Sequence, residues 1–239
     1  MKAWLAALLL CALALGGCET TAEKSAQLEH AAKHVSLGSE QELTITKPSA
    51  YVKVVATQVL HSGEQTAAVV TLRNRSTHTV RDAPIAITVR GANGSVLFKN
   101  NAPGLEAALS KVALLPAGAQ TTWIDDQVQT TKAPASATAV VGEGARASAS
   151  IPQLRVGGIH TIEDPASGPG AAGTVTNRSA VTQDNLVLYA LARRDGRIVA
   201  AGRAVLPEVP AHGSSAFEVF FVGNAKGAQL QISAPPSTF

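Results

Sequence analysis

Cysteine is nearly absent from this sequence. Its two cysteines, Cys11 and Cys18, both lie close to the N-terminus of the 239-residue chain. The region after Cys18 therefore has no disulfide bond and no thiolate chemistry. Its core has to be stabilised by the burial of apolar side chains alone, and the remaining length is enough for one large or two small domains.

Aromatic residues and an excess of one charge are also lacking. Aromatic side chains make up 4% of the sequence, which argues against a surface that stacks sugars or bases. The formal net charge is +3, and it falls to +2 once Lys2 is removed with the N-terminal segment described next. No run of lysine and arginine is present, so we expect no nucleic-acid partner.

The N-terminus has the pattern of a targeting segment. Met1 and Lys2 give a positive start, and residues 3–15 are almost wholly apolar. This run is shorter than the roughly 20 residues that a membrane-spanning helix needs. It ends in Leu15-Gly16-Gly17-Cys18, which resembles the lipobox of bacterial lipoproteins. The resemblance implies that residues 1–17 are a signal peptide that is removed and that the thiol of Cys18 accepts a diacylglyceryl group.

A lipid on Cys18 implies a stable membrane anchor. Two or three acyl chains, at ~0.8 kcal/mol per buried methylene, exceed what lasting attachment requires. Glu19 follows the cysteine. An acid there bears on sorting, but Asp and not Glu is the usual retention signal, so we expect the periplasmic face of the outer membrane in an envelope with two membranes. Residues 18–47 are interpreted as the lipidated cysteine and a flexible tether, with a reach of roughly 30 Å.

The rest of the chain contains an internal repeat with a period of about 100 residues. Four landmarks recur in the same order: a proline, an Asn-Arg-Ser triplet, a turn dipeptide ending in glycine, and a Pro-Ala step before an aromatic residue. They are Pro48, Asn74-Arg75-Ser76, Asn93-Gly94 and Pro116-Ala117 before Trp123, then Pro152, Asn177-Arg178-Ser179, Asp195-Gly196 and Pro210-Ala211 before Phe217. The first copy has about eight extra residues, placed at 100–110, where residues 104–110 could form one helical turn.

Each copy is predicted to be all-β. Ile85, Ile87 and Val89 alternate with less apolar residues, which is the period of a half-buried strand. Asn93-Gly94 and Asp195-Gly196 predict hairpins with type I′ turns. About six or seven short strands per copy are typical of an immunoglobulin-like sandwich. We therefore predict two such sandwiches in tandem, at 48–141 and 151–239, joined by a flexible linker at 142–150.

The second copy resembles a known envelope domain. Thr176-Asn177-Arg178-Ser179, Leu186-Val187-Leu188-Tyr189, Arg194-Asp195-Gly196 and Val209-Pro210-Ala211 together are similar to the FxLYD-type domain of bacterial lipoproteins. The resemblance implies an immunoglobulin-like sandwich with no assigned activity. The sequence departs from the name motif at two positions, because Leu186 stands for its Phe and Ala190 for its Asp.

Few residues suggest chemistry, and we predict no catalytic residue, no cofactor and no metal site. His30 and His34 have the i, i+4 spacing of metal ligands on a helix, but no third ligand is fixed nearby. Asp125 and Asp126 are adjacent, so on a strand they point to opposite faces. One of them would then face a partner domain or solvent while Trp123 fills the core.

We accordingly predict a non-enzymatic lipoprotein that binds, docks or scaffolds. Its partners would be the membrane, through the lipid, and another envelope protein or a wall polymer. The alternative is an envelope hydrolase or carbohydrate-active enzyme with carboxylates on loops, for which Asp125, Asp126, Glu163 and Asp164 are the candidates. Phe220 and Val222 make one strand apolar on both faces, and we interpret them as a contact between the two domains or, failing that, as a partner site.

Overall fold

The computed structural model describes residues 42–147 and 150–239. The predicted signal peptide, Cys18, most of the tether and the pair His30 and His34 lie outside the described residues. The described residues belong to one compact unit. In the described part of the chain, no helix is long and apolar enough to cross a membrane.

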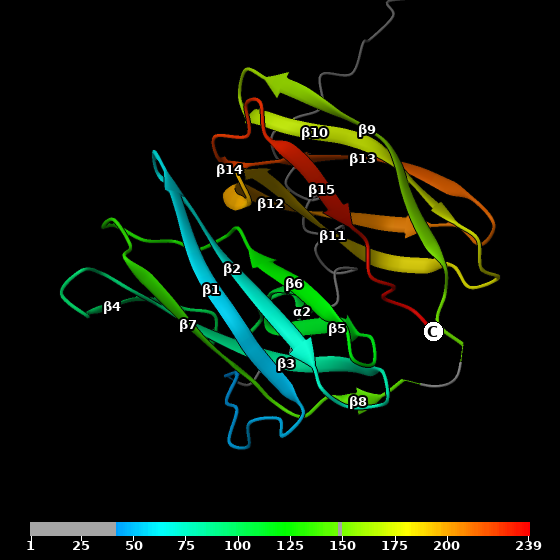
Figure 1. Ribbon diagram of the computed structural model, residues 1–239, viewed down its shortest axis with the longest axis horizontal. Helices are drawn as coiled ribbons and strands as arrows, with labels where there is room; N and C mark the ends of the chain where they lie inside the picture. Colours follow the sequence, from blue (N-terminus) through cyan, green and yellow to red (C-terminus); the bar gives the residue numbers. More distant parts are fainter. Residues whose placement is uncertain (1–41, 148–149) are drawn as a thin grey trace, which may run out of the picture. The chain divides into compact units, whose positions relative to one another are not determined.

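The N-terminal half consists of strands β1 to β8 in two antiparallel sheets (Figure 1). One sheet has the order β1-β2-β6, and in the other β3 pairs with β4, β5, β7 and β8. The bounds are β1 Val52–Ser62, β2 Gln65–Asn74, β3 Val80–Arg90, β4 Val96–Lys99, β5 Lys111–Leu115, β6 Gln120–Asp125, β7 Ser136–Val141 and β8 Ala145–Arg146. Val70 and Leu72 of the first sheet and Ile85 and Ile87 of the second belong to one core cluster, so the sheets pack face to face.

The C-terminal half repeats this arrangement, with one sheet in the order β13-β10-β9 and another in the order β14-β12-β11-β15. The bounds are β9 Leu154–Asp164, β10 Gly168–Asn177, β11 Gln183–Arg194, β12 Arg197–Val209, β13 Ser214–Phe220, β14 Val222–Gly223 and β15 Gln229–Ser233. Every strand pairing among the described residues joins strands of the same half. The all-β fold class is confirmed, while the assignment of each half to the immunoglobulin type stays a prediction.

The extra residues of the first copy interrupt one strand. In the C-terminal half, the single strand β12 pairs with β11 from Arg197 to Val209. In the N-terminal half, two shorter strands, β4 and β5, pair with β3 in the corresponding place. The predicted helical turn lies between them as α2, Ala107–Ser110. Asn100 compensates for the missing strand backbone: its Oδ1 accepts from the Ile87 N–H at 2.6 Å, and its Nδ2 donates to the Ile85 carbonyl at 2.9 Å.

The Asn-Arg-Ser landmark forms the same hydrogen-bonded corner in both halves. The buried Asn74 donates through Nδ2 to the carbonyl oxygens of His78 at 2.8 Å and Leu115 at 2.9 Å. Its Oδ1 accepts from the backbone N–H of Ser76 at 2.9 Å and from the Ser76 hydroxyl at 2.7 Å. The landmark therefore ties the end of β2 to the end of β5.

The corner at Asn177 is built in the same way. Its Nδ2 donates to the carbonyl oxygens of Val181 at 2.8 Å and Val209 at 3.3 Å. Its Oδ1 accepts from the N–H and the hydroxyl of Ser179, at 3.0 and 2.7 Å. The internal repeat in the sequence is thus a repeat of side-chain hydrogen bonding, which explains why the Asn and the Ser recur together.

The two predicted hairpin turns differ. Asp195 and Gly196 both have positive φ, 50° and 76°, as a type I′ turn requires, and they join β11 to β12. In the other hairpin only Gly94 has positive φ. There the Gly94 N–H donates to the Gly91 carbonyl at 2.9 Å, and the connection from β3 to β4 is longer than two residues. The type I′ prediction is therefore wrong for Asn93-Gly94.

Strand β11 is buried on both faces. Leu186 and Leu188 point into the core of the C-terminal half, whereas Val187, Tyr189 and Leu191 belong to the core cluster of the N-terminal half. Alternate side chains of one strand thus reach two different cores. The two halves share apolar surface, which is why this strand is apolar at nearly every position.

The predicted domain contact at Phe220 and Val222 is half correct. Val222 is buried in the core cluster of the N-terminal half. Phe220 is half-buried and lies beside Gly170 of the neighbouring strand β10, where a Cβ would approach its ring to 2.9 Å. The glycine leaves room for the ring, so Phe220 covers its own sheet.

The predicted linker at 142–150 begins too early. Ala145 and Arg146 form β8 and pair with Arg81 and Val80. Gly144 lies so close to β3 that a Cβ would approach the Arg81 carbonyl oxygen to 2.5 Å. The sequence of this segment predicts a flexible linker, but Gly144 instead permits close packing of its own backbone against that of β3.

Candidate binding site

A buried arginine joins the two halves. Arg203 lies on β12, and its side chain is 3% exposed. Its backbone N–H donates to Asp126 Oδ2 at 2.8 Å, its Nε to Asp126 Oδ1 at 3.3 Å, and its Nη1 to Glu106 Oε2 at 3.2 Å. A guanidinium out of contact with water needs such partners. The arrangement satisfies the charge of Arg203 and fixes Asp126 against the C-terminal half, as the sequence had suggested for one of the two aspartates.

Asp125 occupies a different environment. It is 1% exposed, and its Oδ1 accepts the Gln127 N–H at 2.9 Å. Loss of hydration on burial raises the pKa of Asp125 to about 6, and the neighbouring Asp126 carboxylate adds to this rise. The adjacent carboxylates thus have different partners, Gln127 for Asp125 and Arg203 for Asp126, and Asp126 lies just beyond the end of β6.

The structure does not bring the four candidate carboxylates together. Asp125 ends β6, whereas Glu163 and Asp164 end β9 in another sheet. Asp164 Oδ1 accepts the backbone N–H groups of Ala166 at 3.0 Å and Ser167 at 2.7 Å, and these bonds lower its pKa. It serves as the cap of the turn from β9 to β10.

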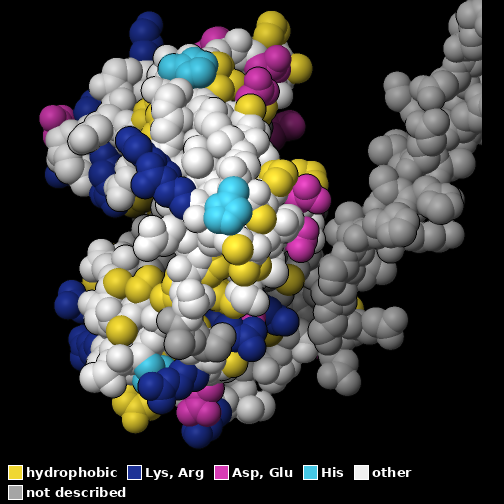
Figure 2. Space-filling model, turned by 90° about the vertical axis from the view of Figure 1, so that its right-hand side faces the viewer, with side chains coloured by type: hydrophobic (Ala, Val, Ile, Leu, Met, Phe, Trp, Pro, Cys, Tyr) yellow, Lys and Arg dark blue, Asp and Glu magenta, His cyan; other side chains and the backbone are white. Residues whose placement is uncertain are grey.

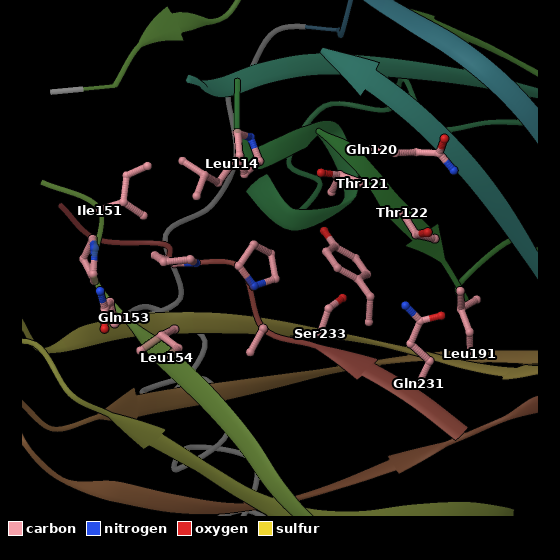
Figure 3. A pocket seen from close by; sticks show the side chains of 16 residues that line it. Leu114, Gln120, Thr121, Thr122, Ile151, Gln153, Leu154, Leu191, Gln231 and Ser233 are labelled. Carbon is pink, nitrogen blue, oxygen red and sulfur yellow. The ribbon is translucent and has the colours of Figure 1, made fainter. Parts of the chain in front are cut away.

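A cavity of about 550 Å³ opens beside the shared surface (Figure 3). One wall comes from β6, another from the face of β11 and β15, and the rest from β5 and from chain next to β9 and β15. The lining residues are Leu114, Pro116, Gln120, Thr121, Thr122, Ile151, Pro152, Gln153, Leu154, Tyr189, Leu191, Gln231, Ser233, Ala234, Pro235 and Pro236. None of them carries a formal charge, so the cavity suits an uncharged ligand with apolar groups and hydrogen-bonding groups.

Tyr189 is one of the residues that line this cavity, and its hydroxyl, which is itself buried, has no protein partner. The residue is 2% exposed and lies on β11 opposite Arg203. Its hydroxyl is the only buried side-chain polar atom without a hydrogen bond in the described part of the chain. Burial raises the pKa of this phenol, so it stays protonated and able to donate. A buried hydroxyl normally finds a partner, so Tyr189 is an exception among the described residues.

Two residues of this region were not singled out from the sequence. Tyr189 belongs to the Leu-Val-Leu-Tyr segment, but the strand pattern alone gives a tyrosine there no special role. Arg203 stands between Gly202 and Ala204 in β12. A charged residue among small residues in the middle of a long strand is the signal that could have identified it.

The described residues contain no group of three or more histidine, cysteine, aspartate or glutamate side chains arranged to hold a metal ion. A smaller cavity of about 260 Å³ is lined by Arg155, Arg178, Thr174, Thr176, Gly157 and Gly158. On the face drawn in Figure 2, basic and acidic side chains form small separate groups with neutral surface between them.

Comparison with known proteins gives little further information. No protein-family model matches the chain, and no curated protein matches it. A solved structure, the 7S globulin of Momordica charantia, aligns over 77% of this chain and 86% of its own, with 10% identity and a TM-score of 0.18. A likeness this weak supports no argument about fold or function.

Proposed function

We propose that this protein is a lipid-anchored envelope lipoprotein whose folded part binds another envelope component and has no catalytic role. The observation that carries the proposal is the uncharged cavity beside Tyr189, whose hydroxyl has no protein partner. Hydrolysis of a glycoside needs two carboxyl groups flanking the bond that is cleaved. The lining of the cavity offers none, and Arg203 already holds Asp126 and Glu106.

The anchor belongs to the same proposal. The lipobox-like segment supports lipid attachment at Cys18, and the tether that follows would hold the binding part roughly 30 Å from the membrane. The resemblance of the second copy to the FxLYD-type domain fits the same location. No cofactor is needed for such a role.

The anchor is tested by Cys18→Ser. Because the serine hydroxyl cannot take the place of the lipidated thiol, we expect the variant to be released into the soluble fraction, whereas the parent chain sediments with membranes. Metabolic labelling with a fatty acid should mark the parent and not the variant. Retention of the unlabelled variant in the membrane would contradict the proposed attachment.

Binding is tested by cross-linking in intact cells, followed by isolation of the protein from the solubilised envelope. Ser233→Arg places a charge in the cavity, and Gln229→Arg places one on the same face of β15 outside it. Both positions are exposed, so the fold should tolerate both changes. We expect one specific adduct or wall attachment that the Ser233 variant loses and the Gln229 variant keeps. Equal capture by the two variants, or none by the parent, would overturn the proposal.

A further inference from the structure

The cavity meets the open edge of strand β6. Strand β6 is the last strand of the sheet β1-β2-β6 and pairs only with β2. Three consecutive residues of β6, at 120–122, line the cavity. Successive side chains of a strand point to opposite faces, so a cavity lined by all three lies along the edge of the strand.

The backbone of Gln120 and Thr122 is directed toward the cavity side of β6. The Asn74 N–H donates to the Ala119 carbonyl at 3.0 Å, so the backbone groups of Ala119 face β2. In an antiparallel ladder this orientation alternates, so Thr121, opposite Leu72, also faces β2. The backbone N–H and carbonyl groups of Gln120 and Thr122 therefore point away from β2. The described residues provide no backbone hydrogen bond to either of them.

The opposite wall of the cavity is the outer face of a sheet. Tyr189 lies opposite Ser233 in the pairing of β11 with β15, and Leu191 lies opposite Gln231. These four side chains share one face, because the neighbouring Ala190, Leu230 and Ile232 belong to the core of the C-terminal half. Figure 3 shows the labelled side chains of β6 across the cavity from those of β15.

We propose that this cavity binds an extended, uncharged polypeptide segment, which pairs with β6 at Gln120 and Thr122 and rests its side chains on β11 and β15. The proposal rests on the proposed binding function and specifies its ligand class. An open strand edge provides main-chain hydrogen bonds for an added strand, and a platform below it selects alternate side chains. The absence of charge in the lining excludes an acidic or basic segment, since its charges would lose water without gaining a partner.

The test uses the full chain and peptides selected from a random displayed library. Gln120→Pro removes one outward N–H at the first residue of β6, a position where proline leaves the ladder to β2 intact. Ser214→Pro is the matched control, because Ser214 is the first residue of β13, the corresponding edge strand of the other half. Ser214 lines none of the cavities described above.

We expect the selection to enrich uncharged peptides. A synthetic copy of such a peptide, with both ends capped, should bind the Gln120→Pro variant about tenfold or more weakly than the parent protein. It should bind the Ser214→Pro variant as tightly as the parent. Amide-exchange protection of residues 120–122 on peptide addition would show strand pairing directly. Selection of charged peptides only, or equal binding by the two proline variants, would overturn the inference. If no peptide binds while cells still give the cavity-dependent adduct, the ligand class is wrong and the binding function stands.

Discussion

At the scale of single residues, the notable feature is how buried polar groups are used. Arg203, Asn74, Asn177 and Asn100 each form two or more hydrogen bonds, at least one of them to a group remote in sequence. The exception is the hydroxyl of Tyr189. Burial of an unbonded hydroxyl costs about 1–3 kcal/mol, so this group lowers the stability of the fold.

Asp125 makes the stability depend on pH. Its pKa of about 6 exceeds the ordinary 3.8, so the folded state holds this proton more tightly than the unfolded chain does. Its contribution is therefore fully present below pH 4 and is lost as the pH rises through 6. Asp125→Asn keeps an acceptor for Gln127 and carries no charge. We expect the variant to gain up to about 3 kcal/mol over the parent at pH 7.5 and little at pH 4.

Urea denaturation at the two pH values measures this difference. The exposed Glu64, in the turn between β1 and β2, supplies the control Glu64→Gln, which should follow the parent at both. If the Asp125 variant has the same dependence on pH as the parent, the pKa of Asp125 is the same in the folded and unfolded states and the assignment is wrong.

At the scale of elements, the two Asn-Ser corners are equivalent and should have equivalent energetic roles. Asn74→Ala and Asn177→Ala each remove the side-chain donor to the Leu115 or Val209 carbonyl and the acceptor of a serine N–H, while the serine hydroxyl still bonds the His78 or Val181 carbonyl. We expect either change to lower the free energy of unfolding by about 2–3 kcal/mol. Thermal or urea unfolding measures the loss.

Asn93→Ala is a control with the same local sequence. Asn93 also accepts from the N–H and the hydroxyl of the serine two residues on, at 3.1 and 2.7 Å, but this turn is exposed to water. Its replacement should cost less than about 0.5 kcal/mol. Equal losses at Asn93 and Asn177 would mean that the corners contribute only local turn geometry.

Local patterns predicted some of these elements and missed others for identifiable reasons. The alternation at Ile85, Ile87 and Val89 predicted a strand, because it depends only on the two-residue period of the backbone. The prediction of a type I′ turn at Asn93-Gly94 is wrong because a dipeptide does not fix the length of the hairpin loop. Ala145 and Arg146 resembled a linker because their pairing depends on a distant strand. The first failure therefore concerns the length of a local loop, and the second concerns a tertiary contact.

At the scale of the whole described unit, the cavity and the ion cluster depend on the placement of one half against the other. No periodicity in the sequence encodes that placement. Asp126 was expected to face either a partner domain or solvent, but its partner Arg203 lies 77 residues further along the chain. The double burial of β11 was predictable only as an apolar excess. Only the structure shows that the second apolar face of β11 packs against the N-terminal half.

Arg203→Met tests whether the two halves are coupled. The change leaves Asp126 and Glu106 without their cation, and breaking a buried pair from one side costs about 3–5 kcal/mol. We expect a loss at the low end of this range, because Glu106 is partly exposed and can be hydrated. Adding Asp126→Asn and Glu106→Gln to the Arg203→Met variant should restore most of the lost stability, because the methionine then packs among neutral groups.

Arg197→Met, at an exposed position of the same strand, should change stability by less than about 0.5 kcal/mol. Calorimetry distinguishes two ways in which the Arg203 loss can arise. If the halves unfold together through their shared core, Arg203→Met lowers one transition and keeps it single. If the cluster alone holds them together, the transition separates into two. We expect a single transition, because Val187, Tyr189, Leu191 and Val222 still bury apolar surface against the N-terminal half when the ion pairs are gone.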